Sequence, residues 1–248
     1  MTKEVKEHFE RTSWSEDEFV RHFIEHADRY IPERKFFKET LLTVFEHYMK
    51  DNNNVRVLEL GCGSGEMAEI LTNSYPGIEL TLTDASVEML KSAQKRFKDS
   101  KTNFIETTFE SILSGDVKLG NFDFVFSSLA LHHLTPEERK EIFKVIHSHL
   151  NPDGFFMNMD THKAPSEEIE KLYLSMKIKA ALNNKTEPGL KSEIDEFIRR
   201  YHDPEHYKRL STLEMDVASL KEAGFSNVDI YYKNGMFACF GGNRQRRS

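Results

Sequence analysis

An acidic side chain and three glycines stand together where a strand is expected to turn into a helix. Glu59 comes two residues before the first of the glycines Gly61, Gly63 and Gly65. Glycine lets the backbone turn sharply and approach a ligand closely, and a helix N-terminus offers N–H groups that lack intrahelical partners. A second acid, Asp84, ends the next expected strand, 19 residues after Gly65, where such folds place a ribose-binding carboxylate. These residue types predict a site for a nucleotide-like ligand at one corner of a sheet.

The glycine spacing separates two classes of nucleotide cofactor. The dinucleotide fingerprint G-x-G-x-x-G needs its third glycine at a position that is Glu66 in this chain. The order E-x-G-x-G-x-G over residues 59–65 instead resembles motif I of the class I methyltransferases, which use S-adenosylmethionine (SAM). SAM carries no pyrophosphate, so a protein turn that binds SAM does not need to cradle phosphates. It has to accept the zwitterionic methionine end of SAM and to provide an acidic side chain for the ammonium group. A tight turn that binds no ligand is the alternative for the motif taken alone.

The resemblance implies roles for the residues of this turn and of the next two strand ends. Glu59 is implied to hold the turn or, through it, the methionine ammonium, and the glycines let the methionine end approach. Asp84 is implied to bind ribose, because one carboxylate accepts from two adjacent hydroxyls; capping the following helix is the alternative. Ala85 and Met89, at the start of that helix, are placed on the cofactor side. Where many members have Asp and an apolar residue for adenine, this chain has Thr108-Phe109, so the Thr108 hydroxyl or backbone is expected there.

The phrase A-L-H-H-L at residues 130–134 resembles the family's edge of the methionine pocket. It implies that Ser128, Leu129 and His133 line the methionine and methyl side. Two adjacent histidines can also suggest a metal, but no Asp, Glu or Cys stands nearby at ligand spacing, so no metal is expected. Tyr30, at the elbow between two expected N-terminal helices, is a candidate lid contact.

A general base is needed only for an acceptor that holds its proton tightly. Ligands bind at the carboxyl ends of strands in doubly wound sheets, and Asp160 and His162 follow the fifth expected strand. Together with His132 they are the candidates for taking a proton. A polar strand end with a cap is the alternative for Asp160 and His162.

The elements that must position these residues follow from hydrophobic periodicity. Strands are expected at residues 55–60, 78–83, 103–107, 122–127, 155–159, 227–233 and 236–241, with amphipathic helices between them. Asn234-Gly235 is a strong hairpin signal, and a terminal antiparallel hairpin is typical of class I methyltransferase sheets. The expected fold class is α/β, a Rossmann-like doubly wound sheet that ends in an antiparallel β-hairpin.

The chain of 248 residues suits one generous domain. Residues 1–50 are expected to form an N-terminal helical cap, or core helices in the alternative, and residues 51–242 the methyltransferase domain. A helical insertion on the acceptor side is expected at 161–210, before the last strands, and a basic tail at 243–248. The net charge of −7 argues against a protein that coats nucleic acid. No membrane-spanning run or signal-peptide core is found, which predicts a cytoplasmic protein.

Taken over about residues 50–242, the resemblance implies a SAM-dependent methyltransferase that works by in-line displacement, and the acidic balance and the cap favour a small-molecule acceptor.

A narrower resemblance, through A-D-R-Y-I-P at 27–32 and L-K-E-A-G-F at 220–225, is to the bacterial enzymes that complete 5-oxyacetyl uridine at the tRNA wobble position. That group uses carboxylated SAM and an insertion arginine, near which Arg199 or Arg200 lies. Its glycine turn reads G-C-S-x-G, whereas this chain keeps Gly63, so ordinary SAM is expected. A SAM-binding regulator, a protein acceptor, and either a monomer or a homodimer remain open.

Overall fold

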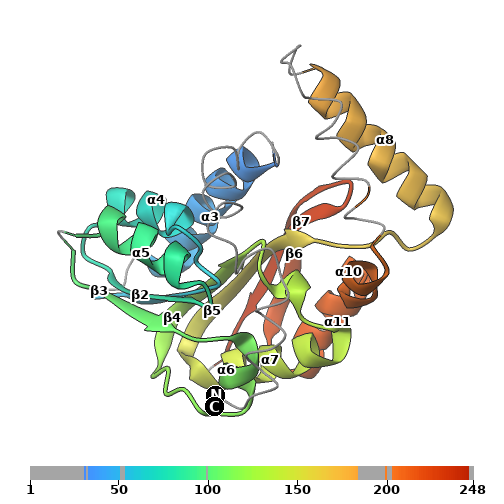
Figure 1. Ribbon diagram of the computed structural model, residues 1–248. Coiled ribbons are helices and arrows are strands. Elements are labelled where there is room, and N and C mark those ends of the chain that lie inside the picture. The colour runs from blue at the N-terminus through green and yellow to red at the C-terminus, as the bar shows by residue number, and fades with distance from the viewer. Residues whose placement is uncertain are drawn as a thin grey trace.

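A seven-stranded sheet in the order β3-β2-β1-β4-β5-β7-β6 forms the centre of the computed structural model (Figure 1). The structure describes residues 31, 33–50, 54–98, 100–183, 199 and 203–245. The first five strands pair in parallel, and β7 pairs antiparallel with both β5 and β6. The strands are β1 (Arg56–Leu60), β2 (Glu79–Asp84), β3 (Thr102–Glu106), β4 (Phe122–Ser128), β5 (Leu150–Thr161), β6 (Ser226–Asn234) and β7 (Phe237–Asn243). The expected doubly wound sheet with its terminal hairpin is confirmed, and its strand order reverses direction between β1 and β4.

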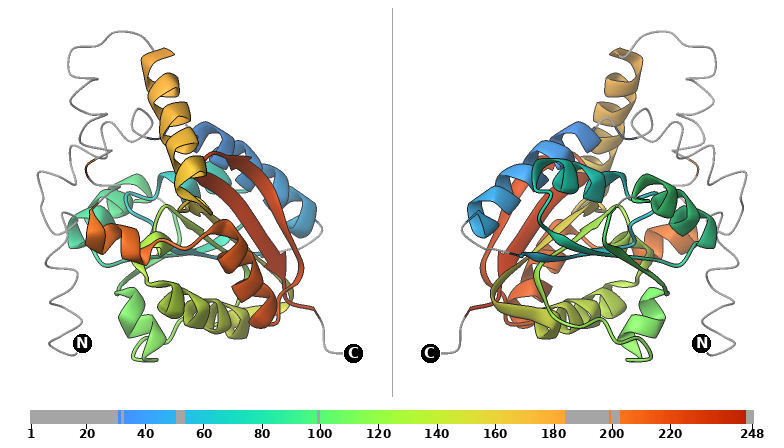
Figure 2. Two further views of the ribbon diagram at one scale, coloured as in Figure 1. Left: turned by 90° about the vertical axis from the view of Figure 1, so that its right-hand side faces the viewer. Right: turned by 90° about the vertical axis from the view of Figure 1, so that its left-hand side faces the viewer.

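Helices cover both faces of the sheet (Figure 2). One face carries α3 (Arg34–Met49), α4 (Glu66–Ser74) and α5 (Val87–Arg96), and the other carries α6 (Phe109–Leu113), α7 (Pro136–His149) and α11 (Leu213–Glu222). Strand side chains alternate between the two layers: Phe155 and Met157 belong to the first core, and Phe156 to the second. Burial on both faces accounts for the nearly continuous apolar runs of β4 and of the second half of β5.

Side-chain caps begin several of the helices. Thr135 forms a capping box with Glu138 ahead of Pro136. In the sequence, Ser211 followed by Glu214 predicts a second capping box, but this prediction is wrong, because Thr212 is the N-cap of α11 and accepts from the Met215 N–H. The Ser211 hydroxyl instead donates to Asp216 Oδ1 at 2.6 Å in the core.

Strand β5 begins earlier than its hydrophobic run predicts. Residues 151–154, which precede the strand expected at 155–159, already belong to β5, and Leu150 pairs with Phe122 before the register shifts at a bulge. A Cβ at Gly154 would lie 3.0 Å from the Asp123 carbonyl oxygen, so only glycine allows the two backbones to approach this closely. The bulge therefore hides the start of the strand from a period-based reading.

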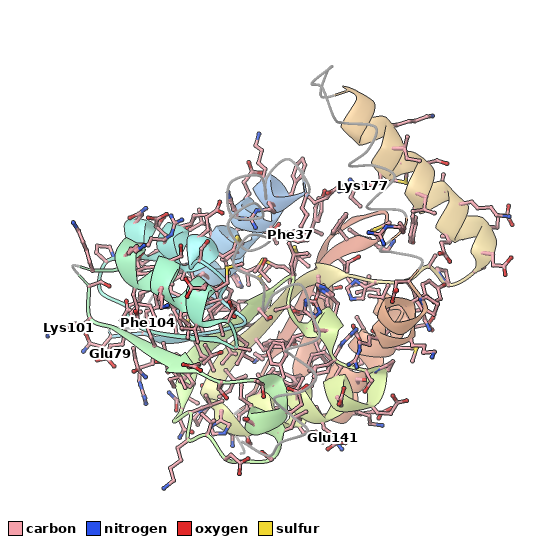
Figure 3. All side chains as sticks on the ribbon, viewed as in Figure 1. Phe37, Glu79, Lys101, Phe104, Glu141 and Lys177 are labelled. Atoms are coloured by element: carbon pink, nitrogen blue, oxygen red, sulfur yellow. The ribbon has the colours of Figure 1, made fainter. Side chains whose placement is uncertain are left out.

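The segment expected as a helical cap is described only in part. Helix α3 packs on the sheet, with Phe37 fully buried in the core (Figure 3). Tyr30 and the other residues before 31 lie outside the described residues, as do Arg200 and the tail residues 246–248. Among the described residues, no helix combines the length and apolar character needed to cross a membrane.

The expected insertion contains α8 (Glu167–Asn183) and α10 (Pro204–Arg209), and α8 projects from the body of the molecule (Figure 1). One face of α8 carries its polar contacts, at residues spaced three and four apart. The Tyr173 hydroxyl accepts from Lys233 Nζ at 2.7 Å, and Glu170 accepts from the Tyr207 hydroxyl at 2.8 Å. On the same face, Lys177 places its ammonium 4.9 Å from the centre of the Phe237 ring.

Candidate functional site

A pocket opens at the carboxyl ends of β1, β2 and β4, where the sheet order reverses. Such switch points form the ligand crevice of doubly wound sheets. Eleven of the thirteen side chains and glycines predicted for the cofactor line this pocket: Glu59, Gly61, Gly63, Asp84, Ala85, Met89, Thr108, Phe109, Ser128, Leu129 and His133. Of the other two, Gly65 is not part of the wall and Tyr30 lies outside the described residues.

The first two glycines serve different contacts in the turn. A Cβ at Gly61 would lie 2.4 Å from the Cβ of Ala130, so this glycine lets the loop after β4 lie directly on the turn. A Cβ at Gly63 would meet only the Met89 sulfur, at 3.7 Å. Both glycines have positive φ, at 67° and 53°, which L side chains rarely adopt. Gly61 thus closes the pocket floor, while Gly63 exposes its backbone to the cavity.

Gly65 corrects the prediction that all three glycines admit the cofactor. It is the N-cap of α4 with φ of 78°. A Cβ there would lie 2.7 Å from Cε2 of Phe97 and 3.4 Å from Cβ of Ala93, on the α5 side. The third glycine therefore allows α4 and α5 to pack closely and does not line the cavity.

Asp84 ends β2 beside the glycine turn. One carboxylate oxygen accepts from the Gly63 N–H and the other from the Ser86 N–H, both at 2.8 Å. Burial raises the pKa of Asp84, although the hydrogen bonds from Ser86, Gly63 and Ala85 oppose the shift. A carboxylate has about four lone-pair sites, so Asp84 can brace the turn and still accept from a ligand in the pocket.

Glu59 is the buried acid of the site. Its residue is 1% exposed and its Oε2 has no hydrogen-bond partner among the described residues. Burial raises the pKa of Glu59 well above its usual value, the Asp84 charge adds to this, and a hydrogen bond from the Ala68 N–H with the charge of Arg34 opposes it. An unpaired buried carboxylate is costly unless a cation arrives to meet it.

Glu59→Gln is expected to remove a pH-dependent loss of stability from the wild-type protein. Because the pKa is raised in the folded state, that state binds the proton more tightly, and stability falls as pH rises from the unfolded pKa through the folded pKa. Urea unfolding should be measured at several pH values between about pH 5 and about pH 8. As the pH rises, the free energy of unfolding of Glu59→Gln should increase relative to that of the wild-type protein. Parallel curves would contradict this account of Glu59; Glu79→Gln, at an exposed strand end, is the control.

Arg34 is a pocket residue that no sequence motif indicated. It is the first residue of α3, is 7% exposed and lines the cavity. It forms an ion pair with Glu66 of α4, to which Lys38 Nζ also bonds at 2.6 Å. Helical spacing places positions 34 and 38 one turn apart, which is the signal that could have marked them as a pair. Two cationic side chains of α3 therefore contact Glu66, the residue that follows the glycine turn.

The remaining walls come from the loops after β3 and β4. The Thr108 hydroxyl accepts from the Ser111 N–H and caps α6, so it acts as a cap in addition to lining the pocket. Leu129 has a φ of 54°, a conformation that costs about 1–3 kcal/mol in a non-glycine residue. Its N–H is held by the Met159 carbonyl at 2.8 Å. Leu129 and its neighbours Ser128 and Ala130 all line the pocket.

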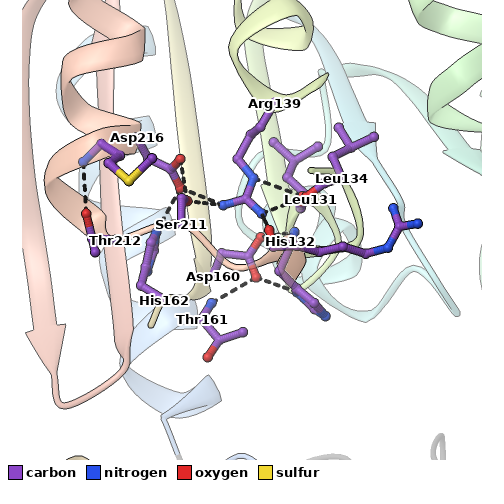
Figure 4. Close-up of polar contacts among 12 residues, drawn as sticks. Leu131, His132, Leu134, Arg139, Asp160, Thr161, His162, Ser211, Thr212 and Asp216 are labelled. Atoms are coloured by element: carbon purple, nitrogen blue, oxygen red, sulfur yellow. Dashed lines mark hydrogen bonds and ion pairs between the residues drawn. The ribbon is translucent and has the colours of Figure 1, made fainter. Parts of the chain in front are cut away.

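The three proton-acceptor candidates are not part of the pocket wall. Asp160 and His162 point to the α7 and α11 layer, where both are buried (Figure 4). His162 Nε2 lies 3.2 Å from Asp216 Oδ2, without an aligned hydrogen bond. His132 bonds to Asp160 and its ring lies 4.2 Å from that of His133, which does line the pocket. Within the described ranges, no three or more His, Cys, Asp or Glu side chains are grouped to hold a metal ion.

Comparison with known proteins adds independent findings. Residues 57–154 match the family model described as "Methyltransferase domain". The juvenile hormone acid O-methyltransferase of Bombyx mori is 31% identical over 181 residues, 72% of this chain and 59% of that protein. The carboxy-S-adenosyl-L-methionine synthase of Nautilia profundicola is 22% identical over 231 residues, 91% of this chain and 92% of that protein.

Solved structures show the same fold. Human N-acetylserotonin methyltransferase in complex with SAM superposes with a TM-score of 0.63 at 15% identity, covering 99% of this chain and 60% of that chain.

This chain spans between 48% and 59% of the length of three curated relatives that it matches. Three findings point to the same family: the matched domain, the E-x-G-x-G-x-G turn that follows β1, and the sheet with its terminal hairpin. Residues 57–154 therefore form a methyltransferase domain of the class I SAM-dependent type, whose cofactor is S-adenosylmethionine.

Proposed function

We propose that this chain transfers a methyl group from SAM, bound in the pocket at the carboxyl ends of β1, β2 and β4, to a small-molecule acceptor. The observation that carries the proposal is the buried Glu59 carboxylate, whose Oε2 has no hydrogen-bond partner among the described residues, beside a turn that is open at Gly63. The methionine end of SAM carries an ammonium and a carboxylate. Glu59 and Arg34 offer the opposite charge to each of them.

The adenosine end is proposed to lie toward β2 and β3. Asp84 is the ribose acceptor in this arrangement, and Ala85 and Met89 form the adjoining wall. Thr108 and Phe109 close the adenine side, with Phe109 near Gly61, where its Cζ would be 3.3 Å from an added Cβ. Ser128, Leu129 and His133 then line the methionine and methyl side. Gly65 supports this arrangement only through the packing of α4.

When bound, SAM supplies a methyl group already activated on a sulfonium. The chain's own residues are therefore proposed to supply positioning and a site with little water, which hold an acceptor in line with the methyl carbon. The strained Leu129 and the 128–134 loop set that geometry.

The helical insertion is proposed to form the acceptor side. Arg209, at the end of α10, donates from Nη1 to the His133 carbonyl at 2.9 Å, which joins the insertion to the pocket wall. A relative whose name specifies an acid O-methyltransferase supports a small-molecule acceptor. The tRNA wobble-uridine alternative stays a prediction from the sequence.

Asp84→Ala is expected to weaken SAM binding by about 1–3 kcal/mol, the scale of a lost hydrogen bond to a charged group. Isothermal titration calorimetry on the purified chain measures this directly. Asp229→Ala is the matched control, because Asp229 also accepts a backbone N–H, from Ile230, but is exposed on the edge strand β6. A folded Asp84→Ala protein with the wild-type dissociation constant would remove Asp84 from the ribose role. Absence of SAM binding by the wild-type protein would end the proposed function.

A further inference from the structure

Two adjacent residues at the start of α3 contact different parts of the molecule. Arg34 lines the cofactor pocket and pairs with Glu66, the first residue of α4 after the glycine turn. Glu33, the N-cap of α3, is 5% exposed, and its Oε2 lies 3.7 Å from the ammonium of Lys177 on α8. The start of α3 therefore contacts both the cofactor pocket and the helix that is proposed for the acceptor side.

Lys177 holds its charge in an enclosed place. Its side chain is 11% exposed, and its ammonium lies 4.9 Å from the centre of the Phe237 ring, at the start of β7. Burial lowers the pKa of Lys177, and the Glu33 carboxylate opposes that shift. Asn234 Nδ2 also donates to Glu33 Oε1 at 3.5 Å. A cation that has lost its water depends on the carboxylate that faces it, so this pair holds α8 to the start of α3.

Two further polar contacts of α8 lead away from the pocket. The Glu170 carboxylate accepts from the Tyr207 hydroxyl of α10, which belongs to the insertion itself. The Tyr173 hydroxyl accepts from Lys233 on the edge strand β6. Of these three contacts, only the one made by Lys177 reaches α3.

Helix α8 leaves much of its own surface open. It projects from the body of the molecule (Figure 1), and the side chains of Leu172 and Met176 are exposed. An element with few buried contacts opens more readily than the core of a protein. The orientation of α8 therefore depends on the contacts along one of its faces, and a restraint on the start of α3 is passed to α8 through Lys177.

We propose that Lys177 is a positioning residue for the acceptor side: it ties α8 to the start of α3, so that a methionine carboxylate bound at Arg34 fixes α8 as well. This rests on the proposed function. The bound carboxylate restrains Arg34, and with it the neighbouring Glu33 in the same helix start. The ion pair with Lys177 carries that restraint to α8. The acceptor side is therefore complete only once the cofactor is bound, and the cofactor binds before the acceptor.

Hydrogen–deuterium exchange of the full chain, read by mass spectrometry over α8, tests this coupling without any acceptor. S-adenosylhomocysteine has the same amino-acid end as SAM. It should slow exchange in α8 by about 5-fold to 150-fold, the usual range for coupled sites, although the described residues of α8 form no part of the pocket wall. Methylthioadenosine keeps the nucleoside but lacks the carboxylate, and at saturation it should leave α8 unchanged. Equal slowing by both ligands, or no slowing by bound S-adenosylhomocysteine, would overturn the proposal.

Lys177→Met keeps an unbranched side chain of similar length and removes its charge. It should abolish the slowing of α8 by S-adenosylhomocysteine. It should also weaken S-adenosylhomocysteine binding by no more than the same factor, because coupling acts equally in both directions. Tyr173→Phe is the matched control, since it removes a hydroxyl contact from the same face of α8 but one that leads to β6; its response to the ligand should persist. A merely structural Lys177 would leave the slowing factor of Lys177→Met as large as that of the wild-type protein, which would overturn the proposal.

Glu33→Gln tests the same pair from its other end, and it decides the question if Lys177→Met does not fold. The slowing of α8 should be lost in this variant too, and the double variant should lose nothing more, because both changes remove one interaction. A full response in a folded Glu33→Gln protein would overturn the proposal. Failure of the wild-type chain to bind S-adenosylhomocysteine in calorimetry would instead end the proposed function.

Discussion

Arg139→Leu is expected to lower the free energy of unfolding by about 3–5 kcal/mol, the cost of breaking a buried ion pair from one side. All of the arginine's donor nitrogens are engaged. Their acceptors are the carbonyls of Leu131, Leu134 and Arg209, the Ser211 hydroxyl and the Asp216 carboxylate. In the wild-type protein burial acts to raise the pKa of Asp216, but His162 and Arg139 outweigh it and lower the pKa. Without the guanidinium, the buried Asp216 carboxyl loses one of these two partners.

Equilibrium urea unfolding measures this cost. Lys140→Gln is the matched control, because the neighbouring Lys140 also makes an ion pair, with Glu222 at 2.5 Å, but both groups are exposed. Its removal should change stability very little. The double variant R139L/D216L should recover part of the loss, since it removes both charges. An Arg139→Leu protein as stable as Lys140→Gln would contradict the role assigned to the buried pair.

Gly61→Ala is expected to lower the free energy of unfolding by roughly 2–5 kcal/mol. About 1–2 kcal/mol comes from a left-handed backbone in a residue with a Cβ, and about 1–3 kcal/mol from overpacking. The added methyl would lie 2.4 Å from the Cβ of Ala130, an atom that cannot rotate away. The loop after β4 would have to move off the glycine turn.

Two other glycines separate the causes of that effect. Gly115 has a φ of 76° and open space around an added Cβ, so Gly115→Ala reports the backbone cost alone. Thermal and urea unfolding of Gly61→Ala should show a clearly larger loss than Gly115→Ala. Equal losses would mean that the contact with Ala130 is accommodated and that the pocket floor is not set by Gly61.

Local patterns could predict the parts of this fold that depend on neighbouring residues. The glycine turn, the period-two strands and the Asn234-Gly235 hairpin each act within a few residues, and each is confirmed. Asp84 could be placed because the end of β2 lies next to the glycine turn in any parallel pairing of these strands. Most of the pocket follows from that register.

The contacts that local patterns could not predict depend on partners distant in the sequence. Asp160 and His162 have the same strand parity as Phe156, whose side chain faces the α7 and α11 layer. The two-residue period of β5 could therefore have shown that both point away from the glycine turn. Nothing local marks Arg139, which meets Asp216 77 residues later. Arg34 likewise meets Glu66 only after the chain has passed through β1.

Calorimetric titration of S-adenosylhomocysteine (SAH) into wild-type, Gly63→Ala and Gly115→Ala proteins tests whether the pocket beside the glycine turn holds SAM. An added Cβ at Gly63 meets little of the protein, only the Met89 sulfur at 3.7 Å, so it intrudes on the ligand's space and not on the core. We expect one SAH per chain with equal affinity for wild-type and Gly115→Ala, and strongly weakened binding for a folded Gly63→Ala. Wild-type affinity in Gly63→Ala, or no binding by the wild-type chain, would contradict it.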